Sequence, residues 1–133
     1  MQWRVRAIRG ATTVAENSVE AIREAVTEFL DALETNNTLD FNEIVSITFS
    51  VTRDIDAVFP AAIARKRPHW NNVPLLDVQQ MHVAGSLPRC IRFLIHFNTP
   101  NPDIAIYHPY LRQAKNLRPD WIMTQVATMA RNQ

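Results

Sequence analysis

Apolar residues recur along this chain with two spacings, and each spacing predicts a type of element. Between residues 19 and 36 the spacing is three or four, which indicates one amphipathic helix with an apolar side made of Val19, Ile22, Val26, Phe29 and Leu33. Asn17 and Glu20 have the spacing of a capping box at its start, and Asn36-Asn37 marks its end. Acidic residues lie between the apolar positions, so we expect a solvated acidic outer face.

Three other stretches alternate apolar and polar residues, as half-buried strands do. In 3–9 the apolar row Trp3, Val5, Ala7 ends at Arg9, and GATTV at 10–14 then predicts a turn. In 44–52 the apolar row is Val45, Ile47, Phe49 and Val51. In 89–97 one face carries Ile91, Phe93, Ile95 and Phe97, and the other carries Cys90, Arg92, Leu94 and His96.

Proline and glycine define the remaining segments. Pro60 predicts a short helix through 61–67, closed by Pro68, and 73–88 holds a short strand and a glycine-containing turn. Pro109 makes 104–117 a broken or edge strand, and 118–133 is expected to be a short helix or a frayed tail. One long helix among strands predicts a single α+β domain over 1–133 with a mixed β-sheet. So little helix leaves sheet surface for oligomerisation to cover.

Composition narrows the possible functions. The chain has 133 residues, the length of one domain, and a net charge of +1, which argues against binding to nucleic acid by bulk charge. It contains no apolar run long enough to span a membrane. The single cysteine, Cys90, cannot form an internal disulfide, so we expect a cytoplasmic protein.

The residues needed for several kinds of chemistry are missing. Two glycines cannot make a nucleotide-binding loop, and the four histidines lack metal-ligand spacing, so we expect neither a nucleotide cofactor nor a metal. We expect Cys90 to be a small buried apolar residue rather than a nucleophile.

Arginine stands out instead, with 12 of the 14 basic residues. The first 43 residues have a net charge of −4 and the rest a net charge of +5. Arg9 ends an apolar strand face, Arg92 interrupts another, and Arg65 lies on the short helix. An arginine on an apolar face needs an anionic partner. That partner is either an internal acid, with Asp54, Asp56, Asp77 and Asp103 available, or a small dianionic ligand.

The order and spacing of several fragments resemble one family, the monofunctional chorismate mutases of the AroH class. These fragments are IRGATTV at 8–14, DIDAVFPAAIAR at 54–65, Trp70 with VPLLDVQQMHVAGSLPRCIR at 73–92, HPYL from 108 and LRPD up to 120. The resemblance implies a homotrimer of α+β protomers that forms a pseudo-α/β-barrel, with active sites between subunits. It also implies the rearrangement of chorismate to prephenate in phenylalanine and tyrosine biosynthesis, without a cofactor.

The resemblance assigns roles to particular residues. Arg9 and Arg65 are the carboxylate contacts, Arg92 lies beside the ether oxygen, and Tyr110 contacts substrate. Phe59, Ala61 and Leu117 match apolar pocket positions. Phe59, Ala61 and Arg65 are expected from one subunit, and Arg9, Arg92 and Tyr110 from its neighbour.

Two positions depart from the family pattern. Gln80 stands where a glutamate is usual, and Asp77 where a cysteine is usual; we expect Gln80 to accept the substrate hydroxyl's hydrogen bond and Asp77 to orient Arg92 and Arg9. The family's lysine is replaced by Ala62, with Lys66 or Arg67 as substitutes. Two other functions stay open: a non-catalytic small-anion binding protein, and a RidA-type enamine or imine deaminase on a similar trimeric barrel. The tail 121–133 is either a lid or frayed.

Overall fold

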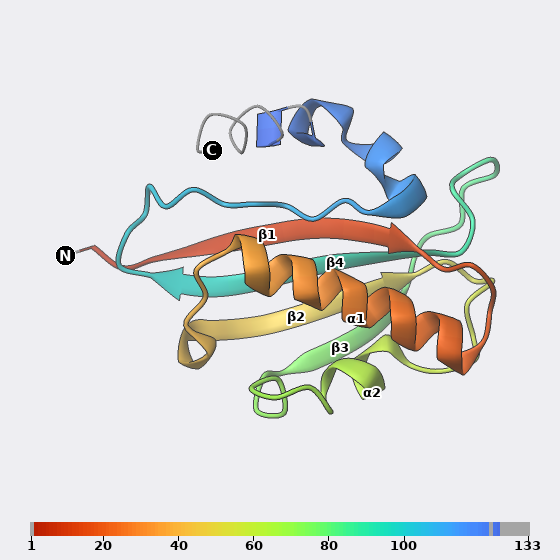
Figure 1. Ribbon diagram of the computed structural model, residues 1–133, viewed down its shortest axis with the longest axis horizontal. Coiled ribbons are helices and arrows are strands. Elements are labelled where there is room, and N and C mark those ends of the chain that lie inside the picture. The colour runs from red at the N-terminus through yellow and green to blue at the C-terminus, as the bar shows by residue number, and fades with distance from the viewer. Residues whose placement is uncertain (1, 123, 126–133) are drawn as a thin grey trace.

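The computed structural model describes residues 2–122 and 124–125, and it contains one mixed four-stranded sheet with a long helix across one face (Figure 1). The strands lie in the order β1-β4-β2-β3. In chain order the elements are β1 (Arg4–Thr13), α1 (Val19–Asn36), the 3-10 helix η1 (Phe41–Glu43), β2 (Ile44–Val51), α2 (Pro60–Ala64), β3 (Leu75–Gln79), β4 (Cys90–Thr99) and the 3-10 helix η2 (Arg112–Leu117). The predicted α+β architecture is confirmed.

β1 and β4 form the longest pairing in the sheet. They run antiparallel with Arg4 opposite Thr99 and Thr13 opposite Cys90. The predicted turn at 10–14 is therefore wrong, because Gly10 to Thr13 continue the strand. The alternation predicted for 89–97 is confirmed, since Ile91, Phe93, Ile95 and Phe97 are buried beneath α1.

β2 pairs antiparallel with β4 on one side and parallel with β3 on the other. A register shift between Ile44 and Ser46 turns Val45 outward, so Val45 is exposed where the alternation predicts burial. Pro60 occupies the first turn of α2, as expected, but α2 ends at Ala64. Gly85 lies in the loop between β3 and β4 with φ 81°.

α1 covers the sheet with an apolar side formed by Ile22, Ala25, Val26, Phe29, Leu30 and Leu33. Its N-cap is Ser18, whose Oγ accepts the Ala21 N–H at 3.1 Å, rather than the predicted Asn17. Asn17 instead accepts hydrogen bonds from the backbone N–H groups of Asp56 and Ala57. The helix ends at Asn36, as predicted. Phe29 stacks on Phe93 of β4 with 3.6 Å between ring centroids, which fixes the helix over the sheet.

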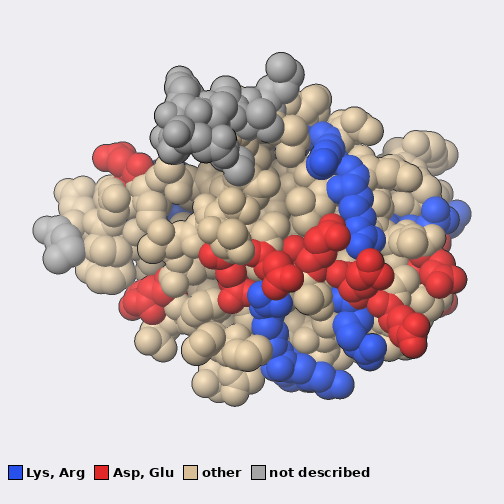
Figure 2. Space-filling model, in the orientation of Figure 1, with Lys and Arg blue, Asp and Glu red and all other residues tan. Residues whose placement is uncertain are grey.

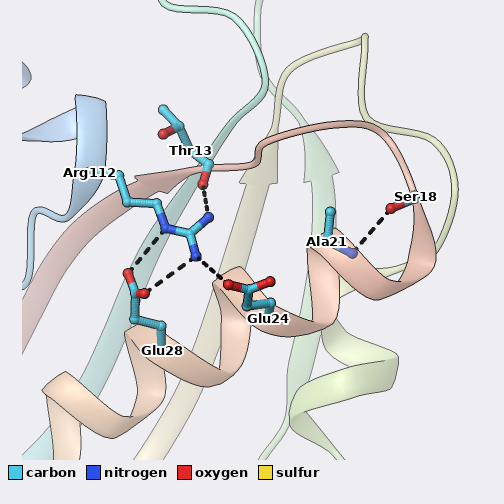
Figure 3. A network of polar contacts seen from close by, with 6 residues as sticks. All are labelled: Thr13, Ser18, Ala21, Glu24, Glu28 and Arg112. Atoms are coloured by element: carbon cyan, nitrogen blue, oxygen red, sulfur yellow. Dashed lines mark hydrogen bonds and ion pairs between the residues drawn. The ribbon is translucent and has the colours of Figure 1, made fainter.

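The outer face of α1 is acidic, and Figure 2 shows its carboxylates as a band bordered by basic side chains. This band is not merely solvated. Arg112 binds Glu28 through Nε at 3.2 Å and the Thr13 carbonyl through Nη1 at 3.1 Å (Figure 3). Arg67, beyond α2, pairs with Asp31 at 2.6 Å. The acidic face of α1 is thus bound by Arg67, which follows α2, and by Arg112 of η2.

The segment after β4 returns along the outer edge of β1 (Figure 1). Only Tyr110 makes a bridge, parallel to Ala11, and residues 112–117 are 3-10 helix, so the predicted broken strand over 104–117 is largely wrong. Residues 119–122 and 124–125 are helical. The rest of the predicted tail, 126–133, lies outside the described residues.

The face of the sheet turned away from α1 carries apolar side chains that the protomer leaves exposed. Val5 of β1 is 54% exposed, Leu76 of β3 is 59% exposed, and Leu94 and Val78 are also exposed. The row that begins with Trp3 and ends at Arg9 lies on this face.

Candidate functional site

Strand alternation brings two of the predicted arginines together on the face away from α1. Ala11 is opposite Arg92 and Arg9 is opposite Leu94, so the side chains of Arg9 and Arg92 leave the same face of adjacent strands. They line a cavity of about 70 Å³ with Gly10, Ala11, Tyr110, Leu117 and Arg118. Four predicted site residues, Arg9, Arg92, Tyr110 and Leu117, are therefore neighbours, and we call this set the arginine half.

Polar atoms in and near the arginine half are buried without a partner. Among the described residues, five buried side-chain polar atoms have no hydrogen-bond partner, and three belong to predicted site residues: Arg92 Nε, Tyr110 Oη and Gln80 Oε1. A buried polar atom without a partner costs about 1–3 kcal/mol, so three such atoms at predicted site residues fit the binding of a polar ligand.

Gln80 extends the ladder beyond β3, since its N–H donates to the Val51 carbonyl at 2.8 Å. Val78 is opposite Ser50, which is in turn opposite Arg92. Continued alternation places Gln80 on the same face as Arg92.

Burial sets the protonation of the groups near Arg92. The pKa of the Tyr110 phenol is raised, mainly by burial, although Arg9, Arg118 and Arg92 act against that shift. The phenol therefore stays a hydrogen-bond donor at neutral pH. Burial also raises the pKa of the Cys90 thiol, whose side chain is fully enclosed. As expected, Cys90 is a buried apolar residue.

The other predicted residues form a second group beside α2. Asp77 of β3 accepts the Ala61 N–H at 3.0 Å through Oδ1, and Arg65 acts on its carboxylate electrostatically. Phe59, which is 70% exposed, lines a cavity of about 500 Å³ together with Asp77. We call Phe59, Ala61, Arg65 and Asp77 the α2 half. Burial raises the pKa of Asp77, while the Ala61 N–H and Arg65 lower it.

The two halves are not brought together within one protomer. β1 and β3 are the opposite edges of the sheet, with β4 and β2 between them, a span of about 14 Å at ordinary strand spacing. Asp77 is also opposite Phe49, a core residue on the α1 side of the sheet, whereas Arg92 points to the other side. Within a single chain Asp77 is therefore far from Arg92 and Arg9, and its role in orienting them stays a prediction for a site shared by two chains.

The suggested replacements for the family's lysine differ in their surroundings. Arg67 is held by Asp31 and Glu34 of α1, so its charge is already paired within this chain. Lys66 is exposed and lines a groove of about 370 Å³ between α1 and α2 with Ala62.

Sequence patterns missed one residue that lines the arginine half. The Arg118 guanidinium lies 3.5 Å from the Trp121 ring centroid and pairs with Asp120 at 3.0 Å. The LRPD fragment signals this position, but alternation does not, because Arg118 lies outside any strand. The described residues contain no group of three or more potential metal ligands. Across the same residues, every helix is too short or too polar to cross a membrane.

Comparison with known proteins gives consistent matches. A family model described as chorismate mutase type I matches residues 5–121. A chorismate mutase AroH from Thermus thermophilus is 45% identical over 117 residues, covering 87% of this chain and 95% of the relative. The AroH of Bacillus subtilis is 36% identical over 121 residues, 91% of this chain and 95% of the relative. The solved chorismate mutase of Clostridium thermocellum superposes with a TM-score of 0.77 at 40% identity, covering 84% of this chain and 98% of that one.

Proposed function

Because the chain belongs to the type I chorismate mutase family, whose members convert chorismate to prephenate, we propose that it catalyses this reaction in sites shared by two protomers. The observation that carries the proposal is the separation of the arginine half and the α2 half onto opposite edges of one sheet. Each half is incomplete in one chain. A second copy supplies the missing half.

Exposed apolar surface supports such an assembly. The sheet face that carries Arg9 and Arg92 also exposes Val5, Leu76 and Leu94. Apolar side chains gathered on one face mark an interface with another chain. Residues of the arginine half lie on that face, so docking of a second copy there seals the site. We propose the homotrimer that the family resemblance implies, in which each of three equivalent interfaces holds one site.

The rearrangement of chorismate requires the protein to position the substrate and to stabilise charge, and it requires no proton transfer. Chorismate rearranges within one molecule, so the protein must hold a compact conformer with both carboxylates bound. We assign Arg9 of one protomer and Arg65 of its neighbour to the carboxylates, because arginine binds carboxylates through two parallel hydrogen bonds. Phe59, Ala61 and Leu117 supply the apolar walls.

Arg92 is assigned to the ether oxygen. Negative charge grows on this oxygen as the carbon–oxygen bond breaks, and a guanidinium already held in place by β4 stabilises it without reorganisation. Its buried Nε has no protein partner, which leaves that donor for the ligand. Tyr110 donates a hydrogen bond from its phenol O–H to the substrate, and Gln80 accepts the hydrogen bond of the ring hydroxyl. The neighbour's Asp77 then provides the carboxylate that Gln80 lacks.

Complementation between variants tests the shared site directly. Arg65→Ala removes the α2 half and Arg92→Ala removes the arginine half, so each homo-oligomer should lose chorismate turnover, measured as loss of its ultraviolet absorbance. Co-refolding the two variants at equal amounts should restore activity to about one quarter of wild type, because random assembly pairs two intact halves in that share of interfaces.

The control is Arg92→Ala co-refolded with an Arg65→Ala, Arg92→Ala double variant, which contains no intact arginine half and should stay inactive. If the mixture of single variants stays inactive as well, the sites do not lie between protomers. If the wild-type protein binds chorismate and leaves it unchanged, the protein is a small-anion binding protein instead.

The free, buried Cys90 suits a reducing compartment, and we place the enzyme in the cytoplasm on that basis.

A further inference from the structure

The outer edge of β1 is completed partly by a side chain. The Ala11 N–H donates to the Pro109 carbonyl at 3.0 Å, and the Leu111 N–H donates to the Ala11 carbonyl at 2.9 Å. Two residues earlier on β1, the Arg9 N–H donates to the side-chain atom Nδ1 of His108 at 3.0 Å. An imidazole therefore holds the backbone of the residue whose side chain lies in the arginine half.

The same histidine is bound to the C-terminal helical segment. Gln125 accepts the backbone N–H of His108 through Oε1 and donates a hydrogen bond from Nε2 to the backbone carbonyl of His108 at 2.9 Å. The Trp121 ring stacks on the imidazole with 4.2 Å between centroids, and it meets Tyr110 edge-on at 6.0 Å. The guanidinium of Arg118, which lines the cavity, lies over the same Trp121 ring. His108 thus contacts both the strand and the segment that encloses the cavity.

We infer that His108 is a positioning residue of the active site, whose neutral imidazole couples the strand bearing Arg9 to the C-terminal turn bearing Leu117 and Arg118. This inference rests on the proposed function, because it assumes that the arginine half binds the substrate. His108 does not line the cavity and makes no contact with it. It acts through the residues that do.

The coupling requires the unprotonated ring. Nδ1 accepts the Arg9 N–H only through its free lone pair. Once Nδ1 is protonated it is itself a donor, and its N–H would face the Arg9 N–H. The pKa of His108 is lowered from its usual value near 6.5, mainly by burial, which outweighs the opposing effect of the hydrogen bond with the Arg9 backbone; the charges of Arg118 and Arg6 lower it further. Among the described residues, these two are the charged groups that act on the ring, and Asp120 is paired with Arg118.

The sign of the pH effect follows from this lowered pKa. Folding favours the neutral His108 ring, so the coupling is complete above pH 6.5 and is lost as pH falls through the pKa of His108 in the folded protein. Because the rearrangement transfers no proton, a pH dependence of this kind comes from groups that bind one another, on the protein or on the substrate, and not from the chemical step. Substrate binding should weaken at low pH while the chemical step is little changed.

Two substitutions separate the hydrogen bond from the packing. In His108→Asn the side-chain amide oxygen can replace Nδ1 as the acceptor of the Arg9 N–H, and this oxygen does not titrate. His108→Phe keeps a ring against Trp121 but has no acceptor. His82→Gln is the matched control, because His82 is an exposed histidine outside both halves.

Steady-state kinetics should be measured for each protein from about pH 7.5 to about pH 4.5. In the wild type and His82→Gln we expect KM to rise about three- to tenfold over this range with kcat within about twofold, as loss of one hydrogen bond predicts. Dividing the wild-type KM by the KM of His108→Asn at each pH cancels the effect of substrate protonation. The KM of His108→Asn should rise at low pH only as far as substrate protonation requires. His108→Phe should show the raised KM already at pH 7.5. Parallel profiles for wild type and His108→Asn, or a wild-type KM for His108→Phe, would overturn the inference.

Hydrogen exchange gives a readout that needs no turnover. The Arg9 amide should lose protection as pH falls in the wild type, after correction for intrinsic exchange rates, and should keep it in His108→Asn. Equal loss in both proteins overturns the coupling even where His108→Phe does not fold. A wild-type protein that does not convert chorismate but shows the exchange difference would refute the proposed function and leave the coupling standing.

Discussion

Gly10 should not tolerate even one additional methyl group, although it lies within a regular strand. A Cβ at this position would meet the Pro109 carbonyl oxygen at 2.2 Å and Cε2 of Phe29 at 2.6 Å. Phe29 cannot retreat, because it belongs to α1 and its ring is stacked on Phe93 of β4. The 109–111 segment must therefore move by about 0.8 Å to reach even the 3.0 Å limit for such contacts.

The cost of Gly10→Ala follows from these contacts. Overpacking a close-packed site costs about 1–3 kcal/mol. Displacing the segment also weakens the two backbone hydrogen bonds that Ala11 makes with Pro109 and Leu111, each worth about 1 kcal/mol. We expect the free energy of unfolding to fall by about 3–5 kcal/mol, a large part of the total of about 5–15 kcal/mol for a domain. Because Tyr110 lies within the displaced segment, kcat/KM should fall about a hundredfold.

Denaturant unfolding followed by circular dichroism measures the first effect, and chorismate turnover measures the second. Gly85→Ala is the matched control, since nothing lies within 4 Å of its Cβ position and only its φ of 81° is unfavourable. That variant should lose about 1–2 kcal/mol and keep its activity. If Gly10→Ala is destabilised no more than Gly85→Ala, the close approach of 109–111 to β1 does not exist as described.

Two further substitutions test individual side chains. Arg92→Lys keeps the charge but loses the planar fork, so we expect kcat to fall about a hundredfold to a thousandfold without a change in unfolding free energy; turnover near the wild-type rate would rule out its assigned role. Asp77→Asn keeps an acceptor for the Ala61 N–H and removes the charge beside Arg65. We expect stability within about 1 kcal/mol of wild type and turnover lowered about tenfold or more, whereas unchanged turnover would leave Asp77 only a structural role beside α2.

The repeating elements could be predicted because their periodicity is local. The apolar spacing of α1 and the alternation of β4 each follow from one stretch of chain, and both are confirmed. Alternation also placed Arg9 and Arg92 as exceptions on apolar faces. The family resemblance selected the site residues, and its order of fragments agrees with the comparisons.

Other features depend on partners distant in sequence. Gly10 to Thr13 read as a turn because of their composition, but pairing with β4 keeps them extended. Asn17 has the sequence of a cap, yet it bonds to the loop at Asp56 and leaves the cap to Ser18. The side of the sheet to which Asp77 points depends on its register with β2, which a single strand's sequence does not contain.

What the sequence determined by itself was therefore the elements, their apolar sides and the residue types available for binding an anion. Tertiary structure decided which of these residues meet: strand order separates Arg65 from Arg9, and the return of 104–111 along β1 brings His108 and Tyr110 beside Arg9. The physical reason is that periodicity comes from the geometry of the local backbone. Pairing comes from hydrogen bonds and packing between segments that lie far apart along the chain.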